Sequence, residues 1–317
     1  MIIILTQCYP PRIGGIENLI FNLSINLSKY EKVLVLADQH NIFDEIPFDR
    51  NFKENLIIRR FGGLKYFRKR NKFRELKKII DLQNIKAVIS DSWKSIEYPI
   101  SNLNNNKIPF ICLVHGNEII IKNYKHQKRI LNSFSKVNKI VSNSEFTKNL
   151  LQKVSPELKN IEVIHPGVSS FDHIIEEKVN LIDGSPTLLT LARLEKRKGH
   201  EFILQSINKL KDKYPNIRYI IAGEGEEKSK LKTLVQSLNI SKNVIFIGSV
   251  NDGEKKFILN KTDLMIMPTI DESKKLSIEG FGITYIEAAL FGIPSIASNV
   301  GGTIEAVLHN NTGIIID

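Results

Sequence analysis

Short apolar runs rich in β-branched residues alternate with helical patterns along the whole chain. In the first half these runs occupy residues 2–5, 33–37, 87–90, 110–114, 139–142 and 161–164. The pattern restarts with runs at residues 187–191, 219–222, 243–248, 263–268 and 294–297. Such alternation predicts parallel strands joined by helices, which form doubly wound α/β sheets. A length of 317 residues suits two domains, each large enough to bury its own core.

A polar stretch without clear periodicity separates the two series of runs. It spans residues 171–185, and we interpret it as a linker. The expected organisation is therefore one α/β domain at residues 1–170 and a second at residues 186–317.

Residues 277–294 carry the most informative pattern for function. The sequence Ser-Ile-Glu-Gly-Phe-Gly-Ile-Thr-Tyr-Ile-Glu is followed by Ala-Ala-Leu-Phe-Gly-Ile-Pro. It predicts a glycine-rich loop and a short helix from about Ile283 to Phe291 that stops at the next glycine. Backbone N–H groups around Phe281, Gly282 and Ile283 would be unpaired at the helix start, where the helix dipole favours an anion. This stretch therefore predicts a backbone anion site.

Two glutamates, Glu279 and Glu287, bracket this anion site, eight residues apart. A glycosidase holds its two carboxyl groups about 5–9 Å apart, whereas eight helical residues span about 12 Å. The pair is therefore unsuited to hydrolytic acid–base work. It is better suited to hold two ends of an elongated anionic ligand, such as a sugar nucleotide. Glycine at Gly280 and Gly282 would let that ligand approach the backbone closely.

Glu279 and Glu287, with Gly-Phe-Gly between them, resemble the E-x7-E motif of the retaining family-4 glycosyltransferases, also called glycosyl transferases group 1. The resemblance covers nearly the whole chain and implies the GT-B fold, two facing Rossmann-like domains with the donor nucleotide mainly on the second. It implies that Glu279 binds donor-sugar hydroxyls and Glu287 the ribose. The backbone at Gly248 resembles the segment that contacts the nucleobase. An ordinary αβ corner of another Rossmann-like domain is the alternative interpretation.

A basic turn, Arg-Leu-Glu-Lys-Arg-Lys-Gly at residues 193–199, follows the first strand of the second half. Arg193 offers a planar fork for phosphate oxygens, and Lys198 offers a compact charge. Both match the phosphate-binding Arg and Lys of the family, so the resemblance implies this role for them. We interpret Lys196 and Arg197 as solvated surface residues.

Two places in the first half are further candidates. The pair Gly14-Gly15 lies between the first strand and its helix, where backbone amides can approach a phosphate. A tight turn would need the same pair, but the resemblance implies a loop that closes on the donor diphosphate. His115 follows a strand, where active-site groups of open α/β sheets lie. With the family pattern we expect it to contact the donor sugar or the acceptor, and Glu118 to be an acceptor contact or base.

A net charge of +11 requires an anionic partner or a solvated surface. Much of it lies in Arg59, Arg60 and residues 64–80, where aromatic residues stand among the cations. This composition favours a helix face that docks on anionic lipid headgroups, with a solvated helix face as the alternative. The family includes enzymes that act on lipid-linked acceptors, which favours the membrane surface. No recognisable nucleic-acid module is present, so we expect no nucleic-acid partner.

No apolar run approaches the ~20 residues of a membrane span, and residues 1–5 lack the basic start of a signal peptide. Cys8 and Cys112 stand at the ends of apolar runs and are expected to be buried free thiols of a reducing compartment. We therefore expect a cytoplasmic protein, peripheral on the inner face of the cell membrane. No Asp-x-Asp occurs in the chain, so we expect no cofactor and no essential metal.

The sequence thus predicts a retaining glycosyltransferase that moves a hexose-type sugar from a UDP- or GDP-sugar to a glycan or lipid-linked acceptor. Capsule, lipopolysaccharide or other cell-surface polysaccharide synthesis is the expected setting. Fixed cations would stabilise the leaving diphosphate in place of a metal. The alternatives are a sugar-nucleotide epimerase, a phosphorylase or a shortened, non-catalytic sugar-nucleotide-binding protein. Family members usually continue with helices beyond the last strand, so we expect either a fragment of a longer protein or a shortened chain.

Overall fold

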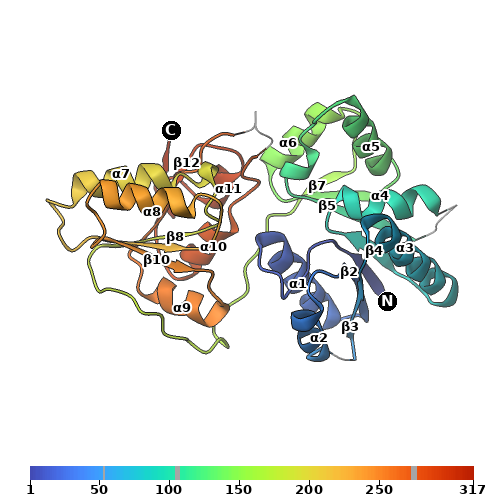
Figure 1. Ribbon diagram of the computed structural model, residues 1–317. Helices are drawn as coiled ribbons and strands as arrows, with labels where there is room; N and C mark the ends of the chain where they lie inside the picture. The colour runs from blue at the N-terminus through green and yellow to red at the C-terminus, as the bar shows by residue number, and fades with distance from the viewer. Residues whose placement is uncertain (53, 104–107, 273–276) are drawn as a thin grey trace. The chain divides into compact units, whose positions relative to one another are not determined.

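The computed structural model describes residues 1–52, 54–103, 108–272 and 277–317. The chain divides into two compact units, Met1–Pro166 and Gly167–Asp317 (Figure 1). The segment interpreted as a linker, residues 171–185, belongs to the second unit and contains no helix or strand. Its Phe171 is buried in the core of that unit.

The first unit is built on a parallel sheet with the strand order β3-β2-β1-β4-β5-β6-β7. The strands are β1 (Ile2–Leu5), β2 (Val33–Asp38), β3 (Leu56–Phe61), β4 (Ala87–Ser90), β5 (Phe110–Val114), β6 (Lys139–Ser142) and β7 (Ile161–Val163). The helices are α1 (Gly15–Ser28), α2 (Ile42–Arg50), α3 (Lys65–Leu82), α4 (Trp93–Asn102), α5 (Tyr124–Phe134) and α6 (Glu145–Val154), with a short 3-10 turn η1 (Asn117–Ile119).

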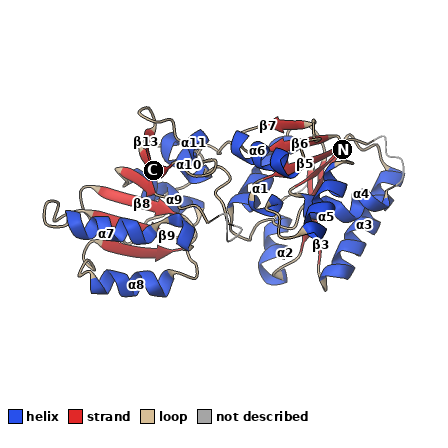
Figure 2. Ribbon diagram, turned by 90° about the horizontal axis from the view of Figure 1, so that it is seen from above, coloured by secondary structure: helices blue, strands red, loops and turns tan. Residues whose placement is uncertain are grey.

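Successive strand residues pack into two separate cores, one on each face of the sheet, because their side chains point to opposite faces. Ile3 and Leu5 pack with side chains of α3, α4 and α5, whereas Ile4 packs with those of α1. All six residues of β2 are buried, as expected for a parallel strand covered on both faces. Figure 2 shows the strands of this sheet lying between its helices.

The second unit repeats this architecture with the strand order β10-β9-β8-β11-β12-β13, again all parallel. Its strands are β8 (Thr187–Leu191), β9 (Arg218–Ala222), β10 (Val244–Gly248), β11 (Leu264–Met267), β12 (Ser295–Ser298) and β13 (Gly313–Ile316). Its helices are α7 (His200–Leu210), α8 (Lys228–Ser237), α9 (Asp252–Asn260), α10 (Ile283–Leu290) and α11 (Thr303–Ala306), with a 3-10 turn η2 (Lys196–Lys198).

Side chains of α7 and α8 cover one face of the second sheet, and those of α9, α10 and α11 cover the other. The predicted fold class, two doubly wound parallel-sheet domains, is confirmed. Strand β3 was not predicted, since Arg59 and Arg60 interrupt its apolar character. In each unit the strand order reverses direction at one point, between β1 and β4 and between β8 and β11. Ligands of open α/β sheets bind beside such a reversal, at the carboxyl ends of the strands.

None of the helices in the described ranges is long and apolar enough to cross a membrane. Both cysteines are free thiols, Cys112 buried and Cys8 partly buried. Burial, reinforced by Glu17 and Asp91, raises the pKa of the Cys8 thiol to about 12.

Candidate active site

Glu279 stands at the centre of the candidate site in the second unit. Its Oε2 accepts hydrogen bonds from Arg197 Nη1 at 2.6 Å and from Lys198 Nζ at 2.5 Å. Burial alone would raise the pKa of Glu279, but Lys198 and Arg197 outweigh it and hold the pKa at about 2. Glu279 is therefore a carboxylate at neutral pH, and its Oε1 accepts no hydrogen bond from the part of the chain that the structure describes.

The basic turn brings two of its cations inward because it is packed tightly on the end of β11. Gly199 adopts a left-handed φ of +74°, and a Cβ there would lie 2.0 Å from the Pro268 carbonyl oxygen. The Ile270 N–H donates to the Arg197 carbonyl at 2.8 Å. This packing buries the side chains of Arg197 and Lys198 and leaves Lys196 exposed.

The interpretation of Arg197 as a solvated residue was therefore wrong. Its side chain is only 6% exposed and pairs with Glu279, as well as with Glu195 Oε2 at 3.0 Å. Arg193, the expected phosphate ligand, joins this cluster only through Glu195, since its side chain is 68% exposed and its Nη1 lies 2.6 Å from Glu195 Oε1. Glu195 thus connects Arg193 with Arg197, a role the sequence analysis did not anticipate.

Glu287 is held by a lysine that the sequence analysis also missed. Lys255, from α9, places its Nζ 2.9 Å from Glu287 Oε1 and 3.2 Å from Asp252 Oδ1. Burial lowers the pKa of Lys255, but Glu287 and Asp252 outweigh this effect and raise it. The ammonium also lies 5.6 Å from the centre of the Phe171 ring. Lys255 is therefore charged, and it fixes one oxygen of Glu287.

The loop between the two glutamates has the predicted form. Gly282 is left-handed, and α10 begins at Ile283. Phe281 is buried in the core of the second unit, and the Gly302 N–H donates to the Glu279 carbonyl at 2.9 Å. The backbone at Gly280 is closely packed too, since a Cβ on Gly302 would lie 2.1 Å from its carbonyl oxygen. The loop that carries Glu279 is therefore fixed against Gly302, with Phe281 anchored in the core.

Gly248 ends β10 with a φ of +78°, and its carbonyl accepts the Gly223 N–H at 2.7 Å. The Gly223 turn follows β9, so both lie at the carboxyl end of the second sheet. Gly248 therefore lies at the edge of the sheet where we expect the nucleotide to bind.

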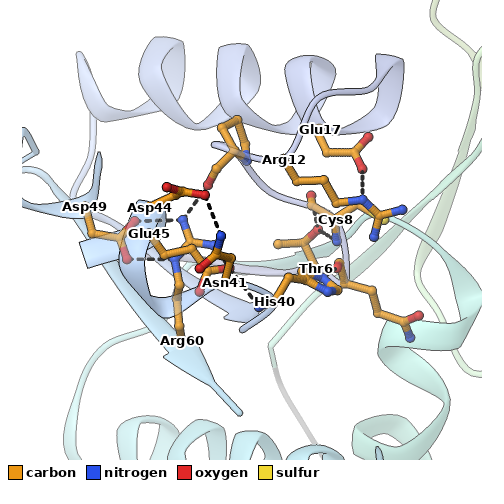
Figure 3. Close-up of polar contacts among 12 residues, drawn as sticks. Thr6, Cys8, Arg12, Glu17, His40, Asn41, Asp44, Glu45, Asp49 and Arg60 are labelled. Atoms are coloured by element: carbon orange, nitrogen blue, oxygen red, sulfur yellow. Dashed lines mark hydrogen bonds and ion pairs between the residues drawn. The ribbon is translucent and has the colours of Figure 1, made fainter. Parts of the chain in front are cut away.

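In the first unit, the glycine pair lies at the start of α1. Gly14 is extended, and a Cβ there would lie 2.2 Å from Glu17 Oε2, while one on Gly15 would meet nothing within 4 Å. Figure 3 shows Glu17 beside Arg12, whose Nε is 3.0 Å from Glu17 Oε1. The same view shows Arg60 with Asp49 and Glu45.

Arg60 is a buried structural residue and not part of a basic surface. Its Nε and Nη2 donate to the two oxygens of Asp49 at 2.7 Å, and its Nη1 lies 3.2 Å from Glu45 Oε1. Nη2 also donates to the Pro10 carbonyl, which fixes the loop before Gly14. Arg60 therefore contributes no charge to a membrane-facing surface.

His115 follows β5 and lies against the end of β4. Its Nε2 is 2.9 Å from the Asp91 carbonyl oxygen, so Nε2 carries the hydrogen and Nδ1 is left as an acceptor. Glu118 Oε1 accepts the His115 N–H at 2.6 Å, which fixes the loop that carries both residues.

Asp91 organises this end of the first sheet, and the sequence analysis missed it. It is buried, and its Oδ2 accepts from Thr6 Oγ1 at 2.8 Å and from the Gln7 N–H at 2.9 Å. Its Oδ1 accepts from Ser95 Oγ at 2.5 Å. The available signal was an acidic residue directly after a predicted buried strand.

In the described ranges no cluster of three His, Cys, Asp or Glu side chains suits a metal ion.

The two parallel-sheet units have the fold of GT-B glycosyltransferases. The structure is similar to that of Anabaena HepE, solved in complex with UDP and glucose, with a TM-score of 0.78 and 15% identity. The similarity covers 99% of this chain and 85% of HepE. Residues 13–170 match the model of Glycosyltransferase Family 4, and residues 172–317 match that of Glycosyl transferases group 1. The chain belongs to this family.

The chain is similar to two glycosyltransferases over different shares of their lengths. An uncharacterized glycosyltransferase of Methanocaldococcus jannaschii is 30% identical over 170 residues, which is 50% of this chain and 41% of the relative. A GDP-mannose-dependent monoacylated alpha-(1-6)-phosphatidylinositol monomannoside mannosyltransferase of Corynebacterium glutamicum is 22% identical over 330 residues. That match covers 99% of this chain and 84% of the relative. The match to the archaeal relative thus spans less than half of that protein.

Proposed function

We propose that this chain is a retaining, metal-independent glycosyltransferase that moves a hexose-type sugar from a nucleotide diphosphate sugar to a glycan or lipid-linked acceptor. The observation that carries the proposal is the pair of glutamates on either side of the start of α10, each held by buried cations. Glu279 is held by Arg197 and Lys198, and Glu287 is held by Lys255. HepE, which has the same fold, was solved with UDP and glucose.

The protonation state of Glu279 supports a binding role for this residue. A general acid needs a pKa near the working pH, and that of Glu279 is about 2. Such a carboxylate accepts hydrogen bonds from sugar hydroxyls through Oε1 while its Oε2 stays with the two cations. Glu287, with one oxygen held by Lys255, accepts hydrogen bonds from the ribose hydroxyls through the other.

The leaving diphosphate is stabilised electrostatically. Arg193, Arg197 and Lys198 are balanced by only two carboxylates, Glu195 and Glu279, which leaves one positive charge in excess. The amides at the start of α10 add the positive end of a helix dipole. A pre-arranged positive site of this kind stabilises a departing anion without a metal ion. The acceptor hydroxyl attacks the anomeric carbon from the face on which the diphosphate leaves. The bond from that carbon to the phosphate oxygen breaks, and the leaving phosphate takes the hydroxyl proton.

The acceptor side belongs to the first unit. The Gly14-Gly15 loop provides amides for the donor diphosphate, and His115 offers Nδ1 as an acceptor for a sugar hydroxyl. We place the enzyme in the cytoplasm at the inner face of the membrane, in cell-surface polysaccharide synthesis, with no nucleic-acid partner. The corynebacterial relative, which is named for a phosphatidylinositol mannoside, supports a lipid-linked acceptor. The anionic surface contacts the exposed part of residues 64–80.

A thermal-shift titration with UDP, GDP, ADP and CMP, with and without EDTA, tests the donor site. One nucleotide should raise the unfolding midpoint, because a ligand at a hundredfold over its Kd stabilises the native state by about 2.7 kcal/mol. Glu287→Ala should abolish the shift, whereas Asp212→Ala, an exposed carboxylate of the same unit, should not.

A nucleotide shift that survives Glu287→Ala would contradict the assignment of the ribose site. Turnover of the donor sugar without any acceptor would instead favour an epimerase, and dependence on inorganic phosphate would favour a phosphorylase.

A further inference from the structure

A cationic pocket opens between α3 and α4 in the first unit, which lie side by side (Figure 1 and Figure 2). Its lining includes five cations and one carboxylate: Lys65, Arg68, Lys69, Lys72, Lys94 and Asp38. Asp38 ends β2, and Lys94 lies in the first turn of α4, directly after β4. The pocket therefore lies at the carboxyl edge of the sheet, beside the reversal of strand order, where ligands bind.

The carboxylates near this pocket are too few for its cations. Asp38 serves two of them, with Lys72 Nζ at 2.5 Å from Oδ1 and Arg68 Nε at 2.9 Å from Oδ2. Lys69 lies 3.5 Å from Glu97, which already accepts two hydrogen bonds from Arg129. The buried Asp91 also acts electrostatically on Lys72, but its oxygens already accept hydrogen bonds from Thr6, Gln7 and Ser95. Six cations thus lie among three carboxylates. In the described ranges no ion pair engages Lys65 or Lys94.

One hydrogen-bond donor beside the pocket also lacks an acceptor. Arg68 Nε is buried and, although it is close to Asp38, its N–H donates no hydrogen bond within the described part of the chain. Lys72 is buried and donates to Asp38 and to the Thr6 carbonyl at 2.7 Å, so its ammonium is fixed at the base of the pocket. An anion with several oxygens can accept hydrogen bonds from several lysine ammonium groups together.

The side chains beside the pocket indicate which kind of molecule bears the anionic group. Leu64, Tyr66 and Phe67, adjacent in sequence to Lys65 of the pocket, are 75%, 61% and 57% exposed. The two rings pack edge to face, with centroids 5.5 Å apart. Exposed aromatic and aliphatic side chains beside cations are typical of surfaces that enter the headgroup region of a bilayer.

We propose that the α3–α4 pocket binds the phosphate group of a lipid acceptor, with Leu64, Tyr66 and Phe67 in contact with its hydrocarbon part. Lys65, Lys69 and Lys94 donate to the phosphate oxygens, and the Lys72–Asp38–Arg68 cluster fixes the base of the pocket. This inference rests on the proposed glycosyltransferase function and names the chemistry of its acceptor. It also separates site-specific recognition of phosphate from a general attraction to anionic membranes.

Vesicle co-sedimentation of the full chain tests the proposal, using phosphatidylcholine vesicles with and without phosphatidic acid. The double variant Lys65→Ala/Lys94→Ala removes two pocket cations but leaves the buried cluster intact. The control Lys77→Ala/Lys78→Ala removes two exposed cations of the same helix that do not line the pocket. We expect binding to the phosphatidic acid vesicles to weaken about tenfold in the pocket variant and at most about threefold in the control.

Equal losses in both double variants would overturn the proposal, because they would show attraction to charge in general. Tyr66→Ser/Phe67→Ser should weaken vesicle binding as well, while glycerol phosphate still competes. Glycerol phosphate binding as tight as vesicle binding would overturn the lipid part and show a soluble phosphate ligand. The vesicle assay needs no nucleotide, and the pocket variant should keep the nucleotide shift of the wild type. Failure at the pocket and failure of the proposed function are therefore distinguishable.

Discussion

At the scale of single residues, the proposed donor site depends on one carboxylate oxygen that accepts hydrogen bonds from two cations. Arg197 and Lys198 both donate to Glu279 Oε2. Burial of this carboxylate opposes its charge, but the two cations overcome that cost and lower its pKa to about 2. Because the unfolded chain has no such arrangement, the ion cluster makes the stability of the protein depend on pH.

The stability of the wild type should therefore fall in acid. The pKa of Glu279 lies below the ordinary value of 4.5, so its contribution is present above that pH and is lost as the pH falls towards 2. A depression of this size corresponds to about 3 kcal/mol. Urea unfolding as a function of pH should show a steeper loss for the wild type than for Glu279→Gln. Parallel curves for the two proteins would contradict this prediction.

Lys255 is a positioning residue for Glu287. Lys255→Met should weaken nucleotide binding about tenfold, since it leaves a buried carboxylate without its partner. Lys255→Arg should restore most of the affinity because it returns the charge, a result that a purely packing role would not give. Titration calorimetry with the nucleotide found by thermal shift measures both. Lys209→Met, which removes an exposed lysine of α7, should bind like the wild type.

At the scale of elements, the turn into α10 decides where both glutamates stand. Gly282 has a φ of +102°, and a Cβ there would lie 2.6 Å from Cδ2 of Tyr285. Tyr285 cannot yield, since its ring is buried and its hydroxyl donates to the Met267 carbonyl at 2.5 Å. At the other end of the helix, Gly292 has a φ of +71°, with nothing within 4 Å of an added Cβ.

These two glycines allow a matched comparison. Gly292→Ala should cost about 1 kcal/mol, from the left-handed conformation alone. Gly282→Ala adds a clash with Tyr285 and should cost about 2–4 kcal/mol. It should also weaken nucleotide binding, because the loop that carries Glu279 must move. Urea unfolding and the nucleotide shift measure the two effects, and equal costs for both variants would show that Tyr285 yields after all.

At the scale of the whole molecule, we propose that the protein's own cations, and not a metal ion, stabilise the leaving diphosphate. Three cations face two carboxylates beside the start of α10. We therefore expect EDTA to leave nucleotide binding unchanged and added Mg²⁺ or Mn²⁺ to change it less than twofold. A nucleotide shift that disappears in EDTA and returns with a divalent ion would contradict this prediction.

The sequence predicted the local features of this protein well. The alternation of apolar runs indicated the parallel sheets, and the glycines and proline around 280–294 indicated α10 to within a residue. Such features depend on neighbours in the chain, where propensity, capping and side-chain period act directly. The interrupted strand β3 was missed for the same reason, since its local pattern is weak.

Only the tertiary structure decided which charges meet. In the basic turn, four cations are nearly equivalent by sequence, but close packing of Gly199 on the end of β11 buries Arg197 with Lys198 and leaves Arg193 exposed. Lys255 meets Glu287 from a different helix, 32 residues away. The sequence by itself determined the elements and the corner that carries the glutamates. The partners of those glutamates depend on strand order, which brings distant segments together and leaves no local periodic signal.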